Sequence, residues 1–129
     1  MNELIKNLRM HLVDALSYLG SFESQQRYKK AVPFVHVPVE LYEQMNQFSP
    51  HRSSSLWYAH VIPNSHVRGS LLTLDEALER HFKTCPRRCS NVPAVFERQS
   101  WIDVRDASQA VIVQLYQTPE YQDTLASYW

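Results

Sequence analysis

The chain has 129 residues, of which 44% are hydrophobic and 20% charged, and its 13 basic side chains balance its 13 acidic ones. This length and composition predict a single ordered globular domain over residues 1–129, and they exclude a low-complexity tail or a flexible linker. The zero net charge disfavours binding to nucleic acid or to an anionic membrane, and the presence of only two glycines excludes the glycine-rich loops of P-loop nucleotidases, Rossmann dehydrogenases and protein kinases.

Two helices are predicted at the N-terminal end of the chain. Apolar residues recur at three- and four-residue spacing from Leu4 to Leu19, which predicts an amphipathic helix ending at Gly20. Charged side chains interrupt this apolar run, so we expect neither a signal peptide nor a membrane-spanning segment here. A second helix is predicted to follow a Ser21 cap and to reach Lys30.

Extended structure is predicted on both sides of a third helix. The segment 32–39 is rich in valine but contains two prolines, which suits an edge strand or an extended connection. Pro38 then opens a helix that reaches Phe48. The segment Leu56–Pro63 is aromatic and β-branched, so it predicts a strand at the centre of a sheet.

The stretch Ser70–Cys89 combines a helix-start pattern with the densest group of reactive side chains in the chain. Thr73 and Glu76 fit a capping box, in which a threonine hydroxyl and a glutamate carboxylate satisfy free backbone donors of the first turn. The helix is therefore predicted to begin at Leu74. Pro86 disfavours helical backbone for the residue before it, so the helix is expected to end one or two residues earlier.

The C-terminal third of the chain is predicted to hold both kinds of element. Residues 92–104 suit a strand with an irregular centre, whereas residues 107–117 fit either a helix capped by Asp106 or a buried strand, with length and cap favouring the helix. Thr118 and Pro119 predict a short terminal helix. Together the elements predict an α+β fold, in which a long N-terminal helix and further helices pack on a short antiparallel or mixed sheet.

The two cysteines are too few for a disulfide scaffold and indicate a reducing compartment, so a cytoplasmic protein is expected. His81, Cys85 and Cys89 are the candidate zinc ligands, but their four-residue spacing departs from the Cys-x-x-Cys pairs of structural zinc sites. The apolar face of the predicted helix accounts for His81 and Cys85 as packed side chains. We therefore expect no metal and no other cofactor.

A candidate catalytic set is formed by His60, His66 and Arg68, which lie on or just after the predicted central strand. Two imidazoles and a guanidinium suit acid and base steps on a phosphodiester, so a small metal-independent nuclease is the alternative function. No motif fixes the distance between the two imidazoles. A cysteine nucleophile activated by Arg87 and Arg88 is the other catalytic possibility, but no local signature of a catalytic cysteine accompanies it.

The charges are unevenly distributed along the chain. Residues 51–105 carry eight basic and five acidic side chains, whereas residues 106–129 carry three acidic and no basic ones. Without a catalytic motif, this pattern predicts a non-catalytic protein-binding module such as an immunity protein or antitoxin, which neutralises a charged toxin or nuclease by covering its active site. A homodimer, with the aromatic chain end docked on a second copy, is a further possibility. The predicted contact residues are Arg80, Arg87, Arg88, Asp106, Glu120, Asp123 and Trp129.

Overall fold

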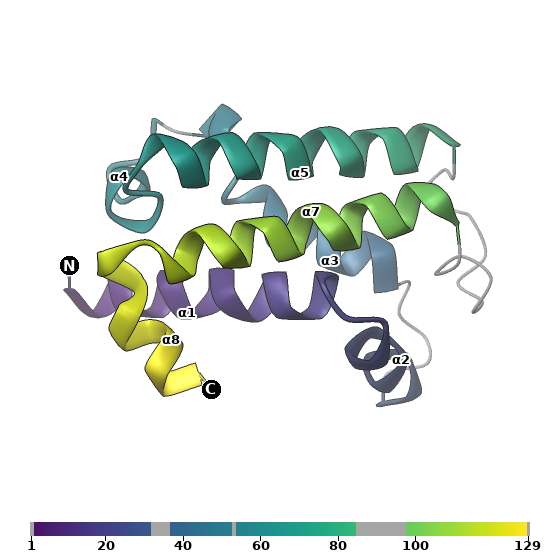
Figure 1. Cartoon of the computed structure of the whole chain (residues 1–129), viewed down its shortest axis with the longest axis horizontal. Helices are drawn as coiled ribbons and strands as arrows, with labels where there is room; N and C mark the ends of the chain where they lie inside the picture. The colour runs from purple at the N-terminus through teal and green to yellow at the C-terminus, as the bar shows by residue number, and fades with distance from the viewer. Residues whose placement is uncertain (1, 32–36, 53, 85–97, 129) are drawn as a thin grey trace.

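The computed structural model describes residues 2–31, 37–52, 54–84 and 98–128. Every regular element in these ranges is an α-helix or a 3-10 helix, and none is a strand. The predicted α+β fold is therefore wrong, and the protein is instead a helical bundle (Figure 1). Within the same ranges, no helix is both long enough and apolar enough to cross a membrane.

Three long helices lie side by side and form the body of the bundle (Figure 1). They are α1 (Asn2–Leu19), α5 (Ser65–Thr84) and α7 (Gln99–Tyr116). Helix α7 lies between the other two, runs in the opposite direction to both, and contacts each of them. The core of the bundle includes the fully buried side chains of Leu12, Leu16, Leu71, Leu74, Trp101, Val104 and Val111.

Shorter helices pack around these three. Helix α2 (Phe22–Ala31) contacts α1 near its C-terminal end, and α3 (Val37–Asn46) contacts both α1 and α2. At the opposite end of the bundle, α4 (Tyr58–Val61) and α8 (Gln122–Tyr128) both contact α1. The two 3-10 turns are η1 (Pro50–Arg52) and η2 (Pro119–Tyr121).

The predicted N-terminal helices are confirmed. Helix α1 ends at Leu19, directly before the predicted stop. The Ser21 hydroxyl oxygen accepts a hydrogen bond from the backbone N–H of Ser24 at 3.2 Å, so Ser21 caps α2 as predicted. Pro38 lies in the first turn of α3, also as predicted, and a turn that follows Asn46 brings the chain to the buried Phe48. Local capping and proline signals therefore identify these three helices.

The predicted start of α5 is wrong, because the helix begins at Ser65 rather than at Leu74. The side-chain oxygen of Asn64 accepts a hydrogen bond from the backbone N–H of Val67 at 2.9 Å and caps the first turn. Helix α5 is described as far as Thr84, and the residues after the predicted end lie outside the described ranges.

Thr73 lies inside α5 and does not cap it. Its hydroxyl donates a hydrogen bond to the backbone carbonyl of Gly69, one turn earlier, at 3.2 Å. The buried residues Val67, Leu71 and Leu74 keep helical spacing across the predicted boundary. The capping pattern is therefore present in the sequence but has no free backbone donors to satisfy.

The predicted central strand over Leu56–Pro63 is also wrong. The segment forms a turn followed by the short helix α4, in which Tyr58, Val61 and Ile62 are fully buried. The Tyr58 hydroxyl donates a hydrogen bond to the carbonyl of Phe48 at 2.9 Å, and burial raises the pKa of Tyr58 to about 12. One helical turn thus buries three side chains of this run and leaves Leu56 exposed, without any strand beside it in the described parts of the chain.

The predicted strand over residues 92–104 is wrong where it can be compared, because residues 99–104 belong to α7 and residues 92–97 lie outside the described ranges. The helical alternative for residues 107–117 is confirmed, but this helix starts at Gln99 and Asp106 lies within it. Spacings of three and four residues between Trp101, Val104, Ser108, Val111 and Leu115 place one continuous buried face against the bundle.

Two smaller predictions concern segments at helix boundaries. The predicted extended segment 32–39 is wrong for residues 37–39, which belong to α3, and residues 32–36 lie outside the described ranges. The short terminal helix is confirmed as η2 followed by α8. Thr118 does not cap it through its side chain, because the hydroxyl donates instead to the carbonyl of Gln114 at 2.8 Å.

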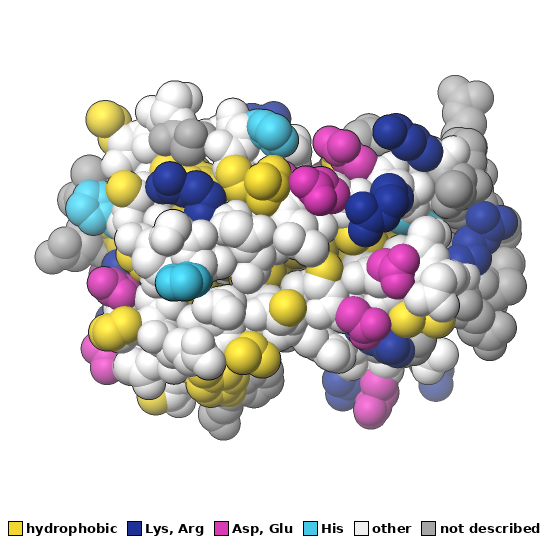
Figure 2. All heavy atoms as spheres, turned by 45° about the horizontal axis from the view of Figure 1, so that its top comes forward, with side chains coloured by type: hydrophobic (Ala, Val, Ile, Leu, Met, Phe, Trp, Pro, Cys, Tyr) yellow, Lys and Arg dark blue, Asp and Glu magenta, His cyan; other side chains and the backbone are white. Residues whose placement is uncertain are grey.

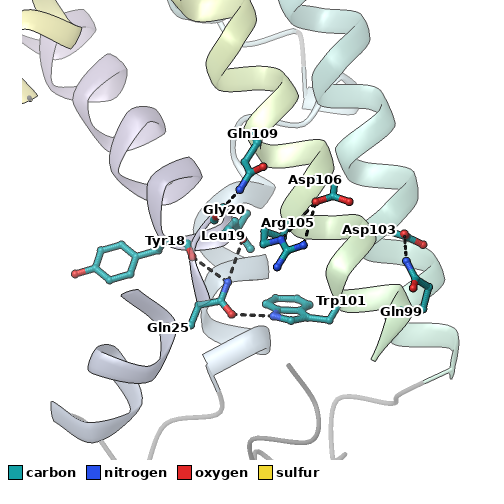
Figure 3. Close-up of polar contacts among 10 residues, drawn as sticks. All are labelled: Tyr18, Leu19, Gly20, Gln25, Gln99, Trp101, Asp103, Arg105, Asp106 and Gln109. Carbon is teal, nitrogen blue, oxygen red and sulfur yellow. Dashed lines mark hydrogen bonds and ion pairs between the residues drawn. The ribbon is translucent and has the colours of Figure 1, made fainter. Parts of the chain in front are cut away.

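A buried polar contact ties α1, α2 and α7 together (Figure 3). The side-chain amide of Gln25 donates to the carbonyls of Tyr18 and Leu19 at 2.9 and 3.0 Å, and its oxygen accepts a hydrogen bond from the indole N–H of Trp101 at 2.9 Å. Gln25 and Trp101 are fully buried. One side chain of α2 therefore satisfies carbonyls at the end of α1 and a donor of α7.

Candidate functional site

A groove of about 730 Å³ lies between the N-terminal half of α1 and the C-terminal helix α8. Apolar side chains of Ile5, Met10 and Ala126 line part of it. Ile5 is almost completely buried, Met10 is half-buried and Ala126 is exposed. The groove is therefore an open surface feature with an apolar part, and charged residues supply most of its remaining lining.

Arg9 fixes the shape of this groove. Its guanidinium donates to the carbonyl of His60 through Nε at 3.2 Å and Nη2 at 2.8 Å, and to the carbonyl of Glu120 through Nη1 at 3.1 Å. The same guanidinium lies over the ring of Tyr121, 5.7 Å from its centroid, which adds a cation–π contact. One side chain of α1 thus holds the backbones of α4 and η2.

Tyr121, in η2, makes a second contact with α4. Its hydroxyl donates to the carbonyl of Val61 at 2.6 Å, and its side chain is fully buried. Burial raises the pKa of Tyr121, and the neighbouring positive charge of Arg9 opposes that rise. The phenol therefore stays neutral at physiological pH and keeps its proton for the hydrogen bond.

The two edges of the groove carry opposite charges. Lys6 and Arg9 come from α1, whereas Glu120 and Asp123 come from η2 and α8. The hydrogen bonds of Arg9 go to neutral carbonyls, and no carboxylate in the described ranges lies within ion-pair distance of its guanidinium. Within the described ranges its positive charge is therefore not paired with a carboxylate.

The groove also contains ionisable side chains of the types that act as acids and bases. His60, Glu120 and Asp123 are all exposed to solvent. Catalytic acids and bases are usually tuned by burial or by a close charged partner, and the described contacts of the His60 ring include no hydrogen bond to either carboxylate. No serine or cysteine nucleophile in the described ranges is held against the imidazole. The arrangement can hold a charged protein surface through two opposite edges.

A second pocket, of about 370 Å³, lies between α3, η1 and α5. In it the Ser49 hydroxyl donates to Oδ2 of Asp75 at 2.5 Å and accepts a hydrogen bond from the backbone N–H of His51 at 3.2 Å. Burial raises the pKa of Asp75, and the Ser49 hydrogen bond and the His51 charge oppose that rise. The carboxylate bonds the serine directly, without an imidazole to take its proton, so the contact fastens η1 to α5 and does not activate a nucleophile.

The structure places the predicted nuclease residues on two helices. His60 lies on α4 and lines the groove, whereas His66 and Arg68 are exposed in the first turn of α5 and are not part of its lining. Sequence reasoning missed Lys6 and Arg9. Their only signal was a three-residue spacing on the polar side of the first helix, which is common on solvent-exposed helix faces.

The predicted zinc ligands are only partly described. His81 is fully buried, its Nδ1 lies 2.9 Å from the Ser100 hydroxyl, and its ring is 5.0 Å from that of Trp101. Cys85 and Cys89 lie outside the described ranges. Within those ranges, no three side chains of the metal-binding types form a group that could hold an ion.

The predicted partner contacts are distributed over two regions of the molecule. Glu120 and Asp123 come together at the groove, whereas Asp106 lies on α7 beside Arg105, with 3.4 Å between Oδ1 and Nε. Arg80 is exposed on α5. Figure 2 shows basic and acidic side chains intermingled at one end of the molecule. Three predicted contact residues lie outside the described ranges, and they are Arg87, Arg88 and Trp129.

Comparisons of the chain with known protein families, proteins and structures identify no relative. No protein-family model matches the chain, and no curated protein and no solved structure matches it either. Any functional proposal must therefore come from the geometry and chemistry of the described residues.

Proposed function

We propose that this protein is a non-catalytic, cytoplasmic protein-binding module, and that it neutralises a partner enzyme by stoichiometric binding, as immunity proteins and antitoxins do. The groove between α1 and α8 is its contact surface. The observation that carries this proposal is the exposed pair of oppositely charged edges beside apolar side chains, held in place by Arg9.

The acidic edge is the part of the groove that selects the partner. Glu120 and Asp123 are both exposed; Glu120 lies on η2, whose backbone Arg9 fixes to α1, and Asp123 lies on α8, the helix that directly follows η2. Charges that are held in place before binding lose little conformational freedom in the complex, and complementary charges raise association rates and exclude wrong partners. A toxin or nuclease with a basic active-site cleft is the kind of partner that this edge fits.

The alternative of a small nuclease has less support. Of its residues His60, His66 and Arg68, only His60 lines the groove, so the groove does not offer both imidazoles to the same phosphodiester. The double variant His60→Ala/His66→Ala tests it directly. If the purified protein cleaves RNA or DNA and this variant does not, the protein is an enzyme and the proposal of a non-catalytic module is refuted.

The contact surface can be tested by affinity capture from the native host. The groove variant is Glu120→Lys/Asp123→Lys, and the matched control is Glu23→Lys/Glu43→Lys, which makes the same charge change at exposed positions outside the groove. We expect the wild type and the control to capture the same enzyme and to inhibit it at a one-to-one ratio, and the groove variant to do neither. An inhibited enzyme that binds the groove variant equally well places the contact elsewhere. Absence of any inhibited enzyme refutes the function.

A further inference from the structure

We infer that the groove between α1 and α8 also receives a second copy of this chain, in a two-fold dimer that buries the proposed contact surface. The starting observation is the charge of the two edges. Lys6, exposed on α1, makes the α1 edge basic, and Glu120 and Asp123 make the opposite edge acidic, whereas the Arg9 guanidinium is bonded to the carbonyls of His60 and Glu120. A surface with one positive and one negative edge is complementary to itself, which is the requirement for a symmetric interface between identical chains.

The charges also select the orientation of the two copies. When the two-fold axis runs parallel to the groove, the basic edge of each copy faces the acidic edge of the other, and Lys6 meets Asp123 twice. When the axis crosses the groove at a right angle, each edge faces the like edge of the other copy. Because like charges in contact are destabilising, only the first arrangement is favourable.

Helix α8 is the part of the second copy that fits the groove. Its exposed side carries Ala126 and Ser127, two small residues beside Asp123, so its backbone can approach the facing helix closely. Its seven residues make a helix of about 10 Å, similar to the length of α1 between Ile5 and Met10. The half-buried thioether of Met10 supplies an adaptable apolar contact beneath it.

A dimer of this form covers Glu120 and Asp123 in both copies. Self-association and binding of a partner enzyme therefore exclude each other. In the absence of a partner the contact surface is buried in the dimer, and a partner that binds more tightly displaces one copy. This competition rests on the proposed function, whereas the dimer itself does not.

The oligomeric state tests the inference. Sedimentation velocity of the full chain at low salt, up to about 500 µM, covers the range expected for a small and polar interface. We expect the wild type to form dimers, and we expect either Lys6→Glu or Asp123→Lys to raise the dissociation constant at least about tenfold. The exchanged pair Lys6→Glu/Asp123→Lys restores opposite charges at the same positions and should recover the dimer.

The controls separate this inference from its alternatives. Lys30→Glu and Glu43→Lys make the same charge changes at exposed positions outside the groove and should dimerise like the wild type. Because Lys6 and Asp123 are exposed, the variants should keep the wild-type circular dichroism spectrum, which excludes misfolding as a cause. Any one of three results overturns the dimer: the wild type stays monomeric, the single variants still dimerise, or the exchanged pair does not recover the dimer. If the wild type is monomeric and the Asp123→Lys variant no longer binds the partner enzyme, the dimer is overturned and the proposed function is not.

Discussion

Replacing Gln25 with leucine removes the buried polar contact that joins α1, α2 and α7, while keeping a side chain of similar size. The indole N–H of Trp101 and the carbonyl of Leu19 each lose the hydrogen bond that Gln25 gives them. The carbonyl of Tyr18 keeps a weaker one, from the backbone N–H of Ser21 at 3.4 Å. The substitution therefore leaves two buried polar groups without their partner (Figure 3).

The size of the effect follows from those two groups. A buried donor or acceptor left without a partner costs about 1–3 kcal/mol, so the free energy of unfolding should fall by about 3 kcal/mol in Gln25→Leu. Urea unfolding followed by circular dichroism measures this change. The matched control is Gln109→Leu, because the Gln109 amide donates to the carbonyl of Gly20 at 2.8 Å in an exposed position, where water replaces it. The control should lose at most about 1 kcal/mol.

A double-mutant cycle refines the test. Trp101→Phe removes the indole donor that pairs with Gln25, so the double variant Gln25→Leu/Trp101→Phe should be more stable than the sum of the two single losses predicts, by about 1 kcal/mol. Additive losses, or a Gln25→Leu protein as stable as the Gln109→Leu control, would refute the role given to this contact.

Three further predictions concern α5 and the groove. Gly69 is exposed within α5 and a Cβ there would meet no atom within 4 Å, so Gly69→Ala should raise the free energy of unfolding by about 1 kcal/mol; a loss measured in urea would contradict this. Arg9→Met should lower it by about 2 kcal/mol, because the carbonyls of His60 and Glu120 lose their donors, and faster hydrogen exchange in α8 should accompany the loss. The pKa of Asp75 is raised in the folded state, so the folded protein binds this proton more tightly than the unfolded chain does. The protonated carboxyl group therefore stabilises the fold at pH values below the unfolded-state pKa, and this stabilisation is lost as the pH rises through the folded-state pKa. Asp75→Asn should therefore remove the fall in stability that begins as the pH rises above the ordinary aspartate pKa of about 3.9. A curve of stability against pH that is unchanged in the variant would show that Asp75 does not contribute to this fall.

The correct helix predictions depend on local interactions. The Ser21 cap and the leucine spacing of α1 act within a few residues, so the sequence contains the whole signal. Gly20 was correctly predicted as the stop of α1, but for a different physical reason. No described glycine has a positive φ, so the end of α1 does not need a left-handed residue; instead, a Cβ at Gly20 would lie 3.2 Å from the carbonyl of Leu16 and 3.3 Å from Gln109.

The wrong strand predictions have one shared cause. Short apolar runs such as Leu56–Pro63 are rich in aromatic and β-branched residues, and periodicity cannot separate a buried strand from a buried helical turn over so few positions. The Tyr58 hydroxyl bonds the carbonyl of Phe48, in the turn after α3, and the indole of Trp101 bonds Gln25 on α2. Tertiary packing overrides the weak strand preference of these segments.

The sequence by itself determined the C-terminal end of α1, the cap of α2, the terminal helix and the charges of individual residues. Only the tertiary structure decided that Lys6 and Arg9 face Glu120 and Asp123 across one groove. Arg9 and Glu120 are joined by a hydrogen bond across 111 positions of sequence. Capping and periodicity act over one or two helical turns, whereas a contact of this range forms only when the apolar faces of the long helices have packed and brought both ends of the chain to the same side of the bundle.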